Sequence, residues 1–182
     1  MRYIIQGSWT KIFSHNTAGG LFSSPEDALT KNPDNPQANL FSILDRLENF
    51  RNAEGNFHFK LCYPELVGKG KGGGYCNEWV QSSNPAVETN ITGFKAVSPL
   101  AFERDSYNKK WAGLGLDGTS MKASLIDDAP SRTHWWTAIG ATRNHRRADT
   151  IPGPRPNVVK TVELYVFNKG KYVKTSKIPL KD

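Results

Sequence analysis

The stretch Phe57-His-Phe-Lys-Leu-Cys-Tyr63 decides the fold class of this chain. Large apolar side chains occupy every second position, and polar or small ones lie between them. Successive side chains of a β-strand point to opposite faces of the sheet, so this period of two predicts a strand with one buried face. His58 and Lys60 are then expected on the face that meets solvent.

Further strands are predicted on both sides of this stretch. The best is Val158–Phe167, and an Asn168-Lys-Gly-Lys turn then leads into residues 172–175, which predicts a closing hairpin. The other expected strands are residues 3–5, 9–13, 78–80, 91–97 and 135–139.

Helices are expected in the N-terminal third. Ser24 precedes Pro25 and two acidic residues, which is typical of a helix start. Residues 38–50 place five apolar side chains on one face of a helix. We therefore predict an α+β fold, with short N-terminal helices packed on a largely antiparallel sheet with long loops. Residues 1–182 are expected to form a single domain.

The chain is basic: it has 24 Lys and Arg residues, 17 Asp and Glu residues and a formal net charge of +7. A basic surface favours acidic partners such as nucleic acid, anionic lipid or sulfated glycan. No nucleic-acid-binding motif accompanies the charge, so nucleic acid is not expected. No stretch approaches the roughly 20 apolar residues of a membrane span, so none is predicted.

Cys62 and Cys76 are the two cysteines of the chain. Their spacing suits a disulfide that closes the loop around the Gly- and Lys-rich residues 68–74; the alternative is two buried free thiols. Asn90-Ile-Thr92 is an N-glycosylation sequon and favours the disulfide. Both features lead us to expect a secreted, extracellular protein.

Polar and aromatic residues cluster in residues 125–140. The cluster combines two carboxylates, a guanidinium, an imidazole and two indoles; these are Asp127, Asp128, Arg132, His134, Trp135 and Trp136. Sugar hydroxyls need charged partners or a calcium ion, and the C–H face of a sugar needs an aromatic ring. The cluster therefore indicates a sugar site. The alternative is that the indoles belong to a core strand and the aspartates to a surface turn.

Catalytic motifs are missing from the sequence. It contains no Walker loop, HExxH, GxSxG or CxxC motif. A glycosidase needs two carboxylates facing each other across a cleft, whereas Asp127 and Asp128 are neighbours and would point apart on a strand. We therefore expect a binding protein rather than an enzyme.

Four segments resemble known lectins. Residues 7–15 are similar to the entry strand of fibrinogen-related domains, and residues 154–167 to the last strand of intelectin-type lectins. Residues 77–85 and 135–140 look like secreted lectin-like proteins of cnidarians and other marine invertebrates. The resemblance implies a calcium-dependent, galactose-type lectin of innate immunity that binds cell-surface or microbial glycans.

If the chain is a lectin, the resemblance implies a binding role for nine residues. Calcium would be held by Asp127, Asp128, Asn77 and Glu78, and the sugar would be contacted by Arg132, His134, Trp135, Trp136 and Trp79. Because a single sugar site binds weakly, a homo-oligomer is expected, most simply a dimer. The competing hypotheses are a polysaccharide-acting hydrolase and a basic matrix or toxin protein that binds sulfated glycans.

Overall fold

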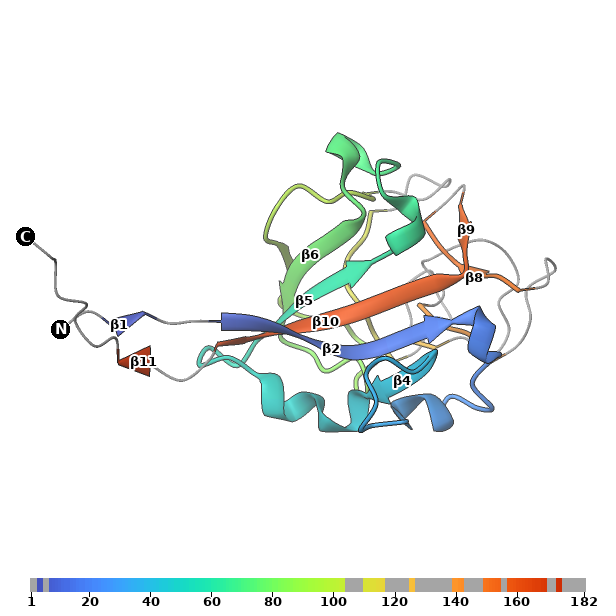
Figure 1. The fold of residues 1–182 in the computed structure, drawn as a ribbon. Helices are drawn as coiled ribbons and strands as arrows, with labels where there is room; N and C mark the ends of the chain where they lie inside the picture. Colours follow the sequence, from blue (N-terminus) through green and yellow to red (C-terminus); the bar gives the residue numbers. More distant parts are fainter. Residues whose placement is uncertain are drawn as a thin grey trace, which may run out of the picture.

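A seven-stranded antiparallel sheet forms the body of the protein (Figure 1). The computed structural model describes residues 3–4, 7–103, 110–116, 125–126, 139–142, 149–154, 157–169 and 173–174. The strands follow the order β3-β4-β2-β10-β5-β6-β7. Their bounds are β2 (Gly7–Asn16), β3 (Thr30–Lys31), β4 (Leu40–Ile43), β5 (Phe57–Cys62), β6 (Cys76–Gln81), β7 (Lys95–Ala96) and β10 (Thr161–Lys169).

Strand β10 occupies the middle of this sheet. It pairs with β2 on one side and with β5 on the other, although β2 and β5 are far from it in the sequence. Two further antiparallel pairs lie outside this sheet: β1 (Tyr3–Ile4) with β11 (Val173–Lys174), and β8 (Ile151–Pro152) with β9 (Val158–Val159). The strands expected at residues 57–63 and 158–167 are confirmed, the latter as β9 and β10.

The sheet has one buried and one half-exposed face, as the period of two predicted. Phe57, Phe59 and Leu61 of β5 are fully buried, as are Val162, Leu164 and Val166 of β10. The alternate residues point outward and are half-buried. We call this surface the outer face; its residues are Trp9, Lys11, His58, Lys60, Glu78, Glu163, Tyr165 and Phe167.

The predicted α+β class is wrong, because the protein is mostly β. The described residues contain only 3-10 helices: η1 (Thr17–Gly19), η2 (Asp27–Leu29), η3 (Leu44–Phe50), η4 (Pro64–Leu66) and η5 (Lys71–Gly73). The helix predicted over residues 38–50 divides into β4 and η3. Leu44 and Leu47 are buried at a spacing of three, which suits the three-residue turn of a 3-10 helix as well as an α-helix. None of the described helices has the length and apolar character needed to cross a membrane.

Two strand predictions also need correction. Residues 91–97 contribute only the two-residue β7 at the sheet edge. Strand β11 does not form a hairpin with β10, because its partner is β1. The strand predicted at residues 135–139 lies outside the described residues except for Ile139, which is buried without being part of a strand.

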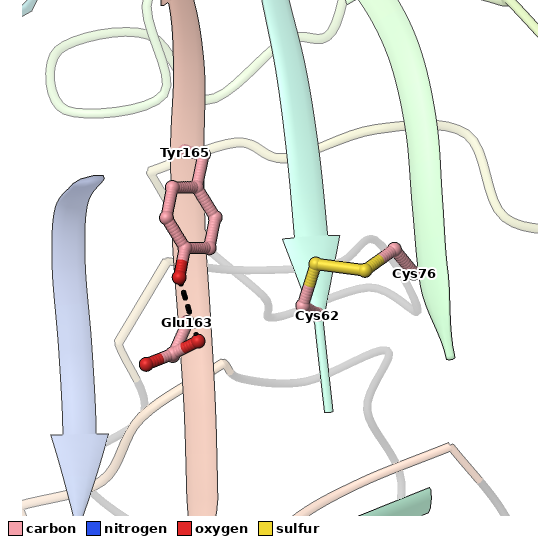
Figure 2. Close-up of a disulfide and its surroundings, with 4 residues drawn as sticks. All are labelled: Cys62, Cys76, Glu163 and Tyr165. Atoms are coloured by element: carbon pink, nitrogen blue, oxygen red, sulfur yellow. Dashed lines mark hydrogen bonds between the residues drawn. A yellow bond between two sulfur atoms is a disulfide. The ribbon is translucent and has the colours of Figure 1, made fainter. Parts of the chain in front are cut away.

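The predicted disulfide is confirmed between Cys62 of β5 and Cys76 of β6 (Figure 2). The two residues are paired directly across the strands, and their Cα atoms lie 4.1 Å apart. Such close approach is typical of the pairs in an antiparallel ladder that share no backbone hydrogen bonds. The bond closes the loop that carries η4 and η5.

Candidate functional site

A cleft of about 310 Å³ lies beside the edge strand β7. We call it the β7 cleft; it is lined by Phe94, Ala96, Ser98, Pro99, Leu100, Glu103, Lys110 and Trp111. Its volume falls at the lower end of the range that is usual for small-ligand pockets. The lining residues come from β7 and the residue before it, from the segment that follows β7 and from residues 110–111.

The floor of the cleft is apolar and its rim is polar. Trp111 and Leu100 are buried, and Phe94 is half-buried. Ser98, Glu103 and Lys110 are exposed at the rim. A hydroxyl, a carboxylate and an ammonium group can together donate to and accept from the hydroxyls of a ligand. The cleft therefore suits a small molecule with one apolar and one hydroxyl-bearing side.

Trp79 supports the floor from beneath. Its ring packs edge-on against Trp111, with the ring centroids 5.2 Å apart. Its Nε1 donates to Oε1 of Gln81 at 2.8 Å, and the Gln81 side chain also bonds both the N–H and the C=O of Leu114. Because Gln81 is fully buried and its amide is fully used, it fixes residues 111–114 to β6.

Asn77 supports the wall of the cleft. Its Nδ2 donates to the carbonyl of Phe102 at 2.8 Å, and its Oδ1 accepts from the N–H of the same residue at 2.9 Å. The N–H of Lys71 in η5 donates to the carbonyl of Ala101 at 2.9 Å. Residues 101–103 are thus held on one side by β6 and on the other by the disulfide-closed loop.

Glu103 also forms an exposed ion pair, with its Oε1 3.2 Å from Nζ of Lys71. Exposed pairs of this kind contribute little to stability. The carboxylate therefore remains available to a ligand at the rim, and replacing it should affect binding more than folding.

The sequence-predicted sites are only partly represented in the structure. Asn77 and Trp79 are buried and act as supports of the β7 cleft rather than as contacts. Glu78 lies on the outer face, where its Oε1 is 2.7 Å from Nε2 of His58. The remaining candidates, Asp127, Asp128, Arg132, His134, Trp135 and Trp136, lie outside the described residues.

The structure does not bring the predicted calcium ligands Asn77 and Glu78 together. They are neighbours on β6 and point to opposite faces, so they cannot share one ion. In the part of the chain that the structure describes, no group of three or more His, Cys, Asp or Glu side chains could hold a metal. Calcium binding remains a prediction that depends on Asp127 and Asp128.

Sequence reasoning missed the residues that line the cleft. Glu103 and Trp111 lie on irregular segments and belong to no motif, and Phe94 lies in the predicted strand 91–97 but outside the short β7 that forms there. They are brought together by the pairing of β6 with β7, by the Gln81–Leu114 and Asn77–Phe102 bonds, and by the bond from the N–H of Trp111 to the carbonyl of Glu103. No local signal in the sequence reports such long-range contacts.

Comparison with protein-family models, with curated proteins and with solved structures finds no significant match to this chain.

Proposed function

We propose that this protein is a non-enzymatic glycan-binding protein and that the β7 cleft holds a sugar residue. The observation that carries the proposal is an aromatic and aliphatic floor beneath a rim of Ser98, Glu103 and Lys110. A sugar needs both parts, because its C–H face packs on aromatic rings while its hydroxyls form hydrogen bonds. The lectin resemblance of the sequence supports the same function.

The support beneath the cleft favours binding without large rearrangement. Trp79, Gln81 and Asn77 are buried and hydrogen-bonded, so the floor and one wall are held before a ligand arrives. A preformed site loses less conformational entropy on binding. Specific recognition of a single sugar is therefore compatible with a shallow cleft.

A glycan array, run with calcium and with a chelator, is the first test. Calorimetric titration of the best ligand should then show that Glu103→Gln and Phe94→Ala each weaken binding about tenfold, or roughly 1.4 kcal/mol. Glu54→Gln and Val87→Ala are matched controls, since both residues are exposed and lie outside the cleft. The controls should bind like the parent.

Several outcomes would contradict the proposal. If no glycan binds, the function is wrong; if the cleft variants bind like the parent, the site is elsewhere. Release of reducing ends from a polysaccharide would support the hydrolase hypothesis instead. Loss of binding in chelator would assign a role to calcium, and Asp127→Asn with Asp128→Asn would then test the predicted ligands.

A further inference from the structure

The outer face carries a second polar and aromatic cluster that shares no residue with the β7 cleft. Most of its charged groups are paired with each other. Lys11 Nζ lies 2.8 Å from Oε1 of Glu163, and the Tyr165 hydroxyl donates to the other oxygen at 2.7 Å (Figure 2). His58 is bonded to Glu78. Each of these acids therefore has a hydrogen-bonding partner, and the Glu78 carboxylate also attracts the nearby Lys60.

Lys60 is the exception on this face. Its Nζ lies 4.2 Å from the ring centroid of Trp9 and 5.2 Å from that of Tyr165. Within the described part of the chain, the ammonium group of Lys60 forms no ion pair and donates no hydrogen bond. Glu78 is the residue facing it on β6, but the Glu78 carboxylate is bonded to His58. Partial burial lowers the pKa of Lys60, and the nearby Glu78 carboxylate opposes this with a smaller effect.

Two aromatic rings stabilise the Lys60 charge but do not complete its bonding. An ammonium group has three N–H donors, and a ring face attracts the charge without replacing an oxygen acceptor. Because Lys60 is half-buried, its ammonium group is only partly open to water. An anionic oxygen at this position would therefore form charge-assisted hydrogen bonds, which are stronger than neutral ones.

The rings that flank Lys60 are held in place by their neighbours. Trp9 packs edge-on against His58 and Phe167, with centroid distances of 5.0 and 5.3 Å. All of these residues lie on the paired strands β2, β5 and β10. The ammonium group is thus presented from a rigid sheet rather than from a loop.

We propose that Lys60, flanked by Trp9 and Tyr165, binds the sulfate ester of a sulfated glycan on the outer face of the sheet. The sulfate supplies the missing acceptors, and the sugar that carries it meets the exposed parts of the aromatic rings. The net charge of +7 assists the approach of such a polyanion. The site is independent of the β7 cleft, so it does not rest on the sugar proposed there.

Calorimetric titration with a heparin-derived oligosaccharide tests this site. Lys60→Gln should weaken binding about tenfold, whereas Lys95→Gln, which removes an exposed lysine of β7, should change it less than about twofold. Lys60→Arg keeps the charge and should recover most of the affinity. Melting curves of all three variants confirm that each one folds.

Titrations with two further ligands show whether the site binds a sulfate ester on a sugar or free sulfate. The same oligosaccharide without its sulfates should bind much more weakly, and inorganic sulfate should compete only at high concentration. Equal losses in Lys60→Gln and Lys95→Gln would show diffuse attraction and overturn the proposal. Equal binding of the desulfated oligosaccharide, or tight binding of free sulfate alone, would also overturn it. Binding of a neutral glycan in the β7 cleft should be the same in all three lysine variants, which keeps the two proposals separable.

Discussion

His15 is a buried histidine whose two ring nitrogens both have backbone partners. Nδ1 accepts from the N–H of Ala141 at 3.3 Å, so Nε2 carries the proton and donates to the carbonyl of Gly20 at 2.9 Å. The ring also packs edge-on against Phe22. Burial lowers the pKa of His15 below its ordinary value of 6.5. The neutral ring therefore connects β2 to the segment just after it at Gly20 and to the distant segment at Ala141.

Folding stability should consequently fall as the pH drops below about 6.5, the pKa that His15 regains on unfolding. Near this pH the unfolded chain binds more protons at His15 than the folded chain does, so the free energy of unfolding rises with pH. Urea unfolding between about pH 5 and 7 measures this slope. His15→Gln should be less stable at neutral pH but show a flatter slope. An unchanged slope in the variant would assign the pH dependence to other groups.

Residue type alone did not separate ligand contacts from supports. Trp79 and Asn77 have the side chains of a sugar site, yet the register of β6 turns both toward the core. Trp111, which does line the cleft, has no pattern around it that sets it apart. Which of the two indoles lines the cleft depends on which segment covers the sheet, and this cannot be predicted from the local sequence.

Strands with a strict period of two were predictable, whereas the helical segments were not. In β5 and β10 every second side chain is buried, because one face of the sheet meets the core. The first part of residues 40–50 forms β4, whose backbone makes cross-strand hydrogen bonds with β2 and β3. The apolar residues in this segment are spaced as in an α-helix, but the segment forms a strand followed by a 3-10 helix.

The disulfide should stabilise the loop between β5 and β6 and, through it, the wall of the β7 cleft. Closing a loop of this length contributes about 3 kcal/mol in the chain-entropy model. We expect the double variant Cys62→Ala and Cys76→Ala to lose about that amount in urea unfolding. Glycan affinity at the cleft should fall as well, since Lys71 in this loop bonds Ala101 and Glu103. Unchanged affinity in the folded variant would show that β6 alone positions the wall.

At the scale of the whole molecule, the class of sheet was predictable but its strand order was not. A largely antiparallel sheet was predicted from the alternating strands and from the absence of helices between them in the later part of the sequence. The position of β10 between β2 and β5 is a non-local contact that no local pattern encodes. The cleft depends on the same long-range order, which explains why its lining residues were missed.

We further propose that the protein acts as a homo-oligomer, most simply a dimer, because one shallow cleft gives modest affinity and two linked clefts multiply it. Sedimentation velocity should show a dimer, and the dimer should agglutinate cells that display the bound glycan. A strictly monomeric protein that fails to agglutinate would contradict this expectation. A monomer with full affinity for the isolated sugar would leave the cleft proposal intact.

The central place of β10 also has a consequence during synthesis. The ribosome makes β2, β4, β5 and β6 before β10, so until β10 is made the two halves of the sheet have no strand to join them. The open edges of β2 and β5 then expose unpaired backbone groups, which are prone to pair with other chains. The sheet is therefore expected to close only once residues 161–169 have been made, and until then both edges remain open to pairing with other chains.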